Sequence, residues 1–409
     1  MTDTPHVPAV FGSHDEKTIA QLQDVASRAD RAAIMADGHV GYVMPIGGVA
    51  AYRNKASVVG VGFDIACGNA AIATDLHVDN FAREDWTKLA DEIARTVSFG
   101  IGRRNQADDA PVDHALFSDD AWNALKDVGG KHEHDALLAK ARNQLGTVGS
   151  GNHYVDVFAD ETGRIWVGVH FGSRGLGHTI ASGFLALSQN EKWGARVKEK
   201  ETLLDRDAPV GEAYWALMNL AGQYAYAGRE WVARKVVSIL GGTEQQLVHN
   251  HHNFAWRESH FGEEYIVVRK GATPAFPGQL GFVGGSMGDD SVILEGAAED
   301  NDRQRSALYS TVHGAGRVMS RTQARGKVKG WGHKARIIAP GLVSWEMLNE
   351  WIGNKGVILR GGGLDESPHA YRRLTDVLAA QGDTIRVRHT LKPIIVVMAG
   401  ENEHDPYKD

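Results

Sequence analysis

The chain is poor in several features that define common protein classes. It has one cysteine among 409 residues, so it forms no internal disulfide and is not a disulfide-stapled secreted scaffold. It lacks a run of about 18 uncharged apolar residues, which argues against a transmembrane helix. Its first twenty residues lack the basic start and apolar core of a signal peptide. We therefore expect a cytoplasmic protein that does not contact a membrane.

Basic residues are also fewer than acidic ones, with 44 Lys and Arg against 51 Asp and Glu. The formal net charge is −7, which argues against a surface that is basic throughout, although a local basic groove is compatible with it. The pattern G-x-x-x-x-G-K-[ST] is missing, so the chain is not a P-loop nucleotidase. Short zinc-finger spacings are missing too, so a structural zinc site is poorly supported.

The chain shows no internal repeat and no proline- or serine-rich linker. Ser13 and Glu16 form a capping-box pattern before a helical periodicity. Glu212 to Leu240 is helical in pattern, with Gly222 and Gly228 as potential breaks. Helices are expected at 13–30, 179–192 and 212–240, strands at 56–61, 164–170 (half-buried), 265–269 and 394–397, and loops with surface helix at 104–140 and 295–307. This mixture predicts an α/β fold in which residues 1–409 form one intertwined domain.

In contrast to the single cysteine and 11 prolines, the chain has many glycines and 19 histidines. Glycine makes up 48 of 409 residues, about 12% against a usual ~7%. Many glycines flank histidines or acidic residues, in segments 36–41, 60–69, 149–153, 170–178, 249–253 and 313–317. Each segment is typical of a strand or helix end that enters a glycine loop, where side chains converge on a site.

The lone Cys67 lies three residues after Asp64, between glycines. Most free cysteines are small buried hydrophobes, and that is the simplest interpretation of Cys67 alone. With Asp64 beside it and histidines in other loops, we favour a metal ligand. His153, His170 and His252 lie in separate segments, so a shared site must be tertiary, and the donor set suits Mn, Zn, Fe or Co. We assign no role to the neighbouring histidines at 249 and 251.

Two glycine loops are candidate anion sites. The first contains Arg174 before an expected helix, and the second contains Ser286 with Ser291 shortly after it. Lys270 could also pair with a phosphate, and a surface lysine is the alternative there. For the glycine loops alone, an ordinary turn is the favoured interpretation. His313 precedes a glycine turn with Arg317 four residues on, which suits a histidine nucleophile and a charge-stabilising guanidinium. A histidine at a helix start is the alternative.

Taken together, these segments resemble the RtcB family of RNA 3′-phosphate/5′-hydroxyl ligases. The resemblance runs from about residue 37 to 400, and its most specific stretches are 60–69, 149–153, 170–177, 252–253, 269–272, 285–288 and 313–322. It implies a single compact α/β domain with central β-structure surrounded by helices and the active site on glycine-rich loops. It also implies two Mn²⁺ ions, GTP, a covalent histidine–GMP and an RNA–ppG intermediate. A 2′,3′-cyclic phosphate end is opened to a 3′-phosphate first.

The resemblance also implies a role for each matching residue. His313 is the guanylylated nucleophile. The metal ligands are Asp64, Cys67 (bridging), His153, His170 and His252. The catalytic or phosphate-contacting residues are Asn152, Arg174, Lys270, Arg317 and, near the metals, Asp37. The remaining nucleotide contacts are Asp156, Asn253, Ser286, Ser291 and Tyr371.

Three positions depart from the family pattern. The lysine near the C-terminus that contacts guanine is replaced by Met398, and a polar tail, 401–409, follows. The glutamate that contacts guanine is replaced by the shorter Asp156, and Ala36 replaces a usual proline. Our hypothesis is that nucleotide selectivity is relaxed or shifted.

Two other functions compete with the ligase. A dinuclear metal phosphoesterase would use the same ligands to activate water, without His313 or a nucleotide. A paralogue that binds RNA ends or nucleotides without ligating them would not need Cys67. For the ligase, we expect a monomer whose partners are GTP and RNA with 3′-phosphate and 5′-hydroxyl ends, held in a groove around Arg174 and Arg317. The resemblance also allows an accessory activating protein.

Overall fold

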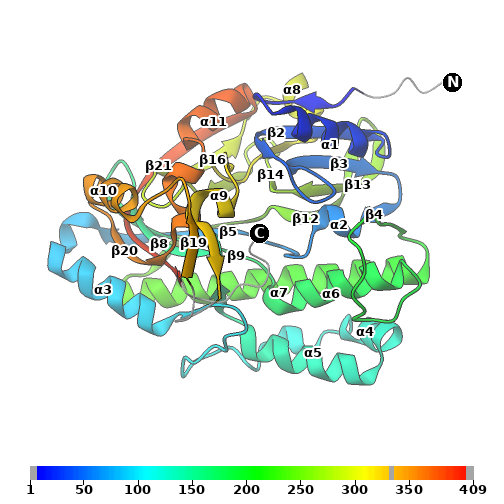
Figure 1. Ribbon diagram of the computed structural model, residues 1–409, viewed down its shortest axis with the longest axis horizontal. Coiled ribbons are helices and arrows are strands. Elements are labelled where there is room, and N and C mark those ends of the chain that lie inside the picture. The colour runs from blue at the N-terminus through cyan, green and yellow to red at the C-terminus, as the bar shows by residue number, and fades with distance from the viewer. Residues whose placement is uncertain (1–6, 331–335, 402–409) are drawn as a thin grey trace.

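Two β-sheets form the centre of the fold in the computed structural model, which describes residues 7–330 and 336–401 (Figure 1). Most of the predicted polar tail, 402–409, lies outside the described residues. The mixed α/β prediction is confirmed. Segments from both ends of the chain enter the same large sheet, because β21 follows residue 384 and pairs with β8 of the first half.

The larger sheet has eight strands. Its order is β11 (Glu244–His251), β5 (Gly68–His77), β9 (Arg164–Phe171), β8 (Tyr154–Ala159), β21 (Ile385–Gly400), β16 (Ser291–Gly296) and β15 (Leu280–Val283), with β20 (Ile358–Gly362) also paired to β21. The second sheet has the order β1 (Ala9–Val10), β2 (Arg31–His39), β3 (Ile46–Tyr52), β13 (Glu263–Lys270) and β12 (Asn253–His260). Two-stranded pairs are β4 (Lys55–Ser57) with β10 (Leu203–Asp205), β6 (Ser98–Phe99) with β7 (Thr147–Gly149), β14 (Ala272–Pro274) with β17 (Ser310–Val312), and β18 (Gly326–Lys329) with β19 (Arg336–Pro340).

Helices cover the sheets on the outside. They are α1 (Glu16–Ala26), α2 (Val58–Val61), α3 (Arg83–Thr96), α4 (Trp122–Gly129), α5 (Lys131–Gln144), α6 (Arg174–Leu187), α7 (Pro209–Leu240), α8 (Asp302–Ser306), α9 (Arg321–Arg325), α10 (Trp345–Lys355) and α11 (Leu374–Gln381). Short 3₁₀ turns occur at η1 (Val78–Asn80), η2 (Ala115–Ser118), η4 (Leu364–Glu366), η5 (Pro368–Ala370) and η6 (Gly382–Thr384). Among the helices of residues 7–330 and 336–401, none has the length and apolar character needed to cross a membrane.

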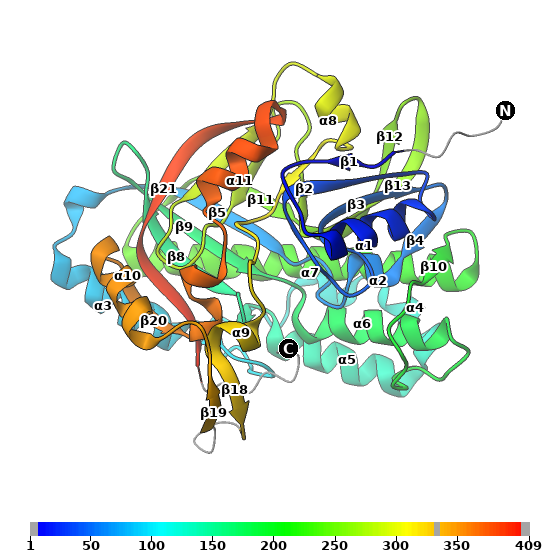
Figure 2. The ribbon, with the colours of Figure 1, turned by 45° about the horizontal axis from the view of Figure 1, so that its top comes forward.

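The long helix α7 joins the cores of the two sheets (Figures 1 and 2). Its first half, with Leu217, packs in the same apolar cluster as Val268 of β13. Its second half, with Val236, packs in the same cluster as Val167 of β9. Burial of apolar surface along one helix therefore fixes the relative position of the two sheets.

Several predicted elements differ in extent from those observed. The first helix begins at Glu16 rather than Ser13, because Asp15 is its N-cap and accepts a hydrogen bond from the Thr18 backbone N–H at 2.8 Å. Residues 58–61 form the one-turn helix α2, not a strand. The helix predicted at 179–192 spans 174–187. The predicted strand at 394–397 is the end of the longer β21.

Two further predictions were also wrong, one on the burial of a strand and one on breaks in a helix. Strand β9 is buried on both faces beyond Arg164, because β5 and β8 flank it and helices and loops cover the sheet. Helix α7 is unbroken, and its glycines serve close packing instead. A Cβ at position 222 would lie 2.9 Å from the Phe254 ring. The burial of β9 and the continuity of α7 were predicted from local sequence pattern, whereas their tertiary neighbours decide both.

Candidate functional site

Strand register brings the predicted metal ligands together where the two sheets meet. Strand β5 starts directly after Cys67, and its first residue pairs with His251 on one side and Phe171 on the other. His252 is the single residue between β11 of the large sheet and β12 of the small one. The His252 backbone N–H donates to the Cys67 carbonyl at 2.8 Å. Cys67 is thereby held between His170 and His252.

The donor atoms form two groups that share Cys67. The ligand atoms of Cys67, His170 and His252 lie within 4.8 Å of one another, and so do those of Asp64, Cys67 and His153. Cys67 Sγ is 3.6 Å from Nε2 of both His153 and His170. This arrangement is what the predicted bridging thiolate requires, and the bridging itself stays a prediction.

Neighbouring backbone and amide groups orient the two imidazoles. His153 Nδ1 lies 2.8 Å from the Val148 carbonyl, and His170 Nδ1 lies 2.5 Å from Asn69 Oδ1. Each contact is satisfied when Nδ1 carries the proton, which leaves Nε2 as the ligand atom. The sequence alone did not identify Asn69 as a partner of His170.

Glycine at position 172 makes room for the carboxylate. A Cβ there would lie 2.1 Å from Asp64 Oδ1. Asp64 Oδ2 is 3.1 Å from His153 Nε2. Although burial raises it, this hydrogen bond and the charges of His153 and Arg174 lower the pKa of Asp64 to about 2. Asp64 is therefore ionised over the whole working range of pH.

Burial sets the protonation of the other donors. It lowers the pKa of His170 and His252 well below the usual value, so both imidazoles are neutral. Burial and the charge of Asp64 raise the pKa of the Cys67 thiol. The buried Nδ1 of His252 has no hydrogen-bond partner among the residues described. Neutral imidazoles, a carboxylate and a thiol that a metal would deprotonate form a donor set that fits Mn or another transition metal.

His313 lies next to this cluster, at the end of β17. Its ring is edge-on to that of His252, with 4.8 Å between ring centroids. His313 Nδ1 is 2.6 Å from Oδ2 of the fully buried Asp37, on β2. The same oxygen accepts the backbone N–H of His313 at 3.0 Å. Asp37 thus contacts His313 on the Nδ1 side of the ring, although Nδ1 has no hydrogen-bond partner among the described residues.

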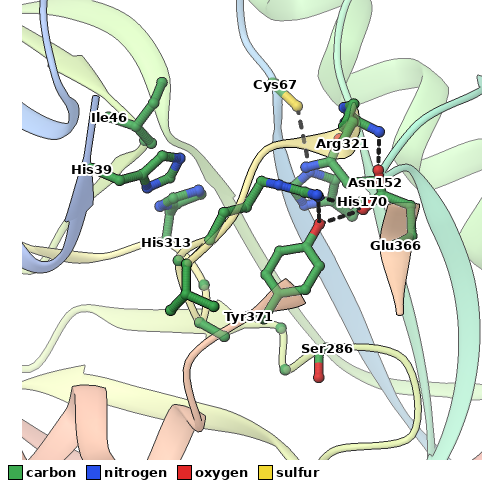
Figure 3. Close-up of a pocket in the computed structure, with 18 of the residues that line it drawn as sticks. His39, Ile46, Cys67, Asn152, His170, Ser286, His313, Arg321, Glu366 and Tyr371 are labelled. Atoms are coloured by element: carbon green, nitrogen blue, oxygen red, sulfur yellow. Dashed lines mark hydrogen bonds and ion pairs between the residues drawn. The ribbon is translucent and has the colours of Figure 1, made fainter. Parts of the chain in front are cut away.

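Most of the predicted site residues border one pocket of about 740 Å³ (Figure 3). Figure 3 shows Cys67, His170, His313 and Tyr371 around the same space, although they come from distant segments. The predicted residues that line it are Asp64, Cys67, Asn152, Asp156, His170, His252, Asn253, Ser286, His313, Arg317 and Tyr371. Met398 lines it too.

Five predicted residues lie behind the lining instead. Two of them, Asp37 and His153, reach the pocket through His313 and Cys67, as described above. Lys270 is buried, with Nζ 3.5 Å from the Val59 carbonyl, and burial lowers its pKa to about 8. Arg174 Nη1 lies 3.2 Å from His153 Nδ1, and Ser291 Oγ accepts the Gly285 backbone N–H at 3.0 Å. Their roles as phosphate or nucleotide contacts stay predictions.

Arg317 contacts protein groups at the pocket wall. Its Nη1 donates to the Tyr371 hydroxyl at 2.8 Å and lies 3.3 Å from Glu366 Oε2, and its guanidinium packs 4.8 Å from the Tyr371 ring centroid. Tyr371 and Arg321 also contact Glu366. The sequence analysis gave no role to Glu366, which no local motif marks, or to Arg321, although Arg321 lies in the matching stretch 313–322. The predicted Tyr371 thus lies beside the predicted Arg317.

Sequence analysis also missed Arg229, a fully buried residue of α7. Its Nη1 donates to the Ala66 carbonyl at 2.9 Å and to the Phe171 carbonyl at 2.6 Å. Its Nη2 lies 2.8 Å from His251 Nδ1. One guanidinium therefore ties together the three segments that carry Cys67, His170 and His252. The histidine at 251, to which we assigned no role, serves as one of these anchors.

We expect the substitution Arg229→Met to weaken metal binding by about tenfold or more, since it frees the three ligand-bearing segments. It should also lower the free energy of unfolding by about 3 kcal/mol, because it strands buried carbonyls. Calorimetric titration with Mn²⁺ and a chemical denaturation curve measure the two effects. Arg234→Met, on the exposed side of the same helix, is the control. Wild-type Mn²⁺ affinity in Arg229→Met would contradict the positioning role.

A cluster of metal donors beside an oriented imidazole suits enzymes that transfer phosphoryl or nucleotidyl groups with metal assistance. Comparison with known proteins identifies the family to which the chain belongs. The family model described as "tRNA-splicing ligase RtcB" matches residues 17–399. The chain therefore belongs to the RtcB family.

Individual relatives agree with the family match. The chain is 31% identical to the RNA-splicing ligase RtcB of Escherichia coli K12, over 89% of each chain. It is 31% identical to the tRNA-splicing ligase RtcB of Thermococcus kodakarensis, over 84% of this chain and 82% of that protein. It is 30% identical to the tRNA-splicing ligase RtcB of Nanoarchaeum equitans, over 92% and 88%.

Proposed function

We propose that this protein joins RNA 3′-phosphate ends, or 2′,3′-cyclic phosphate ends after opening, to 5′-hydroxyl ends through a covalent nucleotide on His313. The observation that carries the proposal is the 2.6 Å contact between Asp37 Oδ2 and His313 Nδ1 beside the donor cluster. The carboxylate lies on the Nδ1 side of the ring, which supports Nε2 as the attacking atom in a pocket that also holds metal donors. A dinuclear phosphoesterase that activates water does not require such a nucleophile.

The first step transfers GMP to the protein. His313 Nε2 forms a bond to the α-phosphorus of GTP, the bond from that phosphorus to the bridging oxygen breaks, and pyrophosphate leaves with the electron pair. Asp37 stabilises the positive charge that the imidazole gains, since its carboxylate lies 2.6 Å from Nδ1. An oxygen of the RNA 3′-phosphate then displaces the histidine, giving RNA–ppG. The 5′-hydroxyl of the second end attacks the RNA phosphorus, and GMP leaves.

Two metal ions would be held by Asp64, Cys67, His153, His170 and His252, and we propose Mn²⁺. When bound, they neutralise phosphate charge that would repel the nucleophile. The protein itself positions the groups: Asn69 and the Val148 carbonyl hold the imidazoles, and Arg229 holds the loops.

Mass spectrometry tests the proposal directly. The purified protein is incubated with Mn²⁺ and each nucleoside triphosphate in turn, and the intact mass is measured. We expect the mass to rise by one nucleoside monophosphate, with the modified peptide containing His313. Absence of an adduct with every triphosphate, together with hydrolysis of a phosphodiester, would support the phosphoesterase instead.

We also infer that the base choice is relaxed relative to other family members. Asp156 and Met398 lie on the paired strands β8 and β21 and both line the pocket. Met398 has no N–H to donate to a base oxygen. Burial raises the pKa of Asp156 well above its usual value, and Oδ1 has no hydrogen-bond partner among the described residues. A neutral carboxyl offers one donor and one acceptor, which matches the N1 and N6 amino group of adenine. Guanine presents two donors on that edge and favours an ionised carboxylate.

We expect ATP to form the adduct at a rate within about tenfold of GTP, a difference of about 1.4 kcal/mol in transition-state free energy. The double variant Asp156→Glu, Met398→Lys should shift the preference back toward GTP by tenfold or more, because it restores the reach and the N–H donor. Competition between ATP and GTP in the mass measurement gives the ratio. A strict GTP requirement in the unmodified protein would contradict the inference.

A further inference from the structure

One segment of this acidic protein contains basic residues but no acidic ones. From residue 303 to 345 the chain contains nine Lys or Arg and no Asp or Glu, although the whole chain has a net charge of −7. The middle of this segment forms the two-stranded pair of β18 and β19. Figure 2 shows the pair projecting from the body of the molecule next to α9.

The strand register places like charges opposite each other. Lys329 of β18 pairs directly with Arg336 of β19, and Lys327 lies two residues away on the same face of β18. All three side chains are exposed. Like charges directly opposite in an antiparallel pair destabilise it, so this arrangement is not explained by the stability of the hairpin. A bound polyanion would remove the repulsion.

Carboxylates of the described residues do not neutralise these three cations. Within 7–330 and 336–401, none of Lys327, Lys329 and Arg336 has an ion-pair partner. By contrast, exposed arginines at positions 53, 234 and 305 pair with carboxylates at 2.5 to 2.8 Å. Unlike those three arginines, the hairpin cations are left without a neutralising carboxylate in the described part of the chain.

The hairpin begins at the rim of the pocket. Gln323 lines the pocket, and its carbonyl accepts the Leu342 backbone N–H at 2.9 Å, which closes the base of the hairpin. Exposed apolar side chains accompany the charges: Ile338 is 62% exposed and Leu342 is 68% exposed. Cations beside the pocket suit the phosphate backbone of a single strand, and the exposed aliphatic groups add apolar surface next to them.

We propose that Lys327, Lys329 and Arg336 of the β18–β19 hairpin bind the phosphate backbone of a single RNA strand whose end enters the pocket. This rests on the proposed function, which supplies an RNA end as the substrate of His313. It differs from the groove around Arg174 and Arg317 predicted from sequence, since Arg174 does not line the pocket and Arg317 contacts Tyr371 and Glu366.

Fluorescence anisotropy tests the surface. The probe is a single-stranded RNA of about 20 nucleotides with a 3′-phosphate, titrated with the full protein at several salt concentrations. The test variant is Lys327→Gln, Lys329→Gln, Arg336→Gln. The matched control, Lys88→Gln, Lys126→Gln, Lys131→Gln, removes the same charge from α3, α4 and α5. A third variant, Lys327→Arg, Lys329→Arg, keeps the charge.

We expect the test variant to bind RNA about 10- to 100-fold more weakly near 0.1 M salt, with a salt slope smaller by about 2, since three phosphate contacts are lost. The control and the charge-keeping variant should bind like the unmodified protein. Equal RNA affinity in the test and control variants would overturn the proposal, and so would an equal loss in the charge-keeping variant. Binding of poly-glutamate as tightly as RNA of equal charge would assign the surface to an acidic protein instead.

Measuring nucleotide transfer to His313 distinguishes a failure of the hairpin proposal from a failure of the proposed function. All three variants should form the nucleotide adduct on His313 at the unmodified rate, because the hairpin does not line the catalytic part of the pocket. If the unmodified protein forms no adduct, the proposed function fails, whereas the RNA titration still reports on the hairpin.

Discussion

The substitution His313→Ala is expected to abolish the nucleotide adduct and to lower RNA ligation by about 10⁴-fold or more. No other imidazole among the described residues has its Nδ1 against a buried carboxylate while facing the pocket; His39, which also lines it, contacts only the Asp37 carbonyl, at 3.2 Å. Intact mass after incubation with Mn²⁺ and triphosphate measures the adduct. A gel assay with 3′-phosphate and 5′-hydroxyl RNA measures ligation.

Two further variants serve as a control for His313→Ala and as a test of the role of Asp37. His389→Ala, at an exposed histidine paired with Glu161, should leave the adduct unchanged. Asp37→Asn should keep the nucleophile but slow adduct formation by about 10²-fold or more, because the amide does not select the Nδ1 proton or stabilise the charged ring. Persistence of the adduct in His313→Ala would reject the assigned nucleophile.

The substitution Cys67→Ala is expected to remove high-affinity metal binding and ligation together. Cys67 is the one member common to both donor groups, so its loss affects both ions. The side chain is small and buried, and its removal should lower the free energy of unfolding by only about 1 kcal/mol. Calorimetric titration with Mn²⁺ measures affinity, and Co²⁺ substitution adds a thiolate-to-metal absorption band that should vanish.

Cys67→Ser is the matched variant, because an oxygen replaces the sulfur at nearly the same volume. It should retain the fold and lose the thiolate band. Unchanged Mn²⁺ stoichiometry in Cys67→Ala would contradict the bridging role. A loss of stability much larger than 1 kcal/mol would assign Cys67 to the core rather than to the metal site.

Most residues of the candidate site could be predicted from the sequence because their motifs are local. The spacing of Asp64 and Cys67 and the turn after His313 follow from adjacent residues. Long helices and strands such as 212–240 and 265–269 were also predicted, since periodicity is a short-range property. The exact limits of elements were not predicted, as the helix at 58–61 shows. There the Gly60 backbone N–H donates to the Ser57 hydroxyl oxygen, and this cap favours a turn in a run that resembles a strand.

The sequence by itself indicated the candidate donors and the candidate nucleophile, but the tertiary structure alone decided how they meet. Asp37 and His313 are far apart in the chain and become partners only because β2 and β17 lie together. His252 becomes a ligand candidate because it is the residue at which the chain passes from one sheet to the other. Arg229 gains its role from three carbonyl and imidazole contacts that no motif encodes. Such contacts depend on strand order and on the packing of α7, which are set by burial over the whole chain rather than by neighbouring residues.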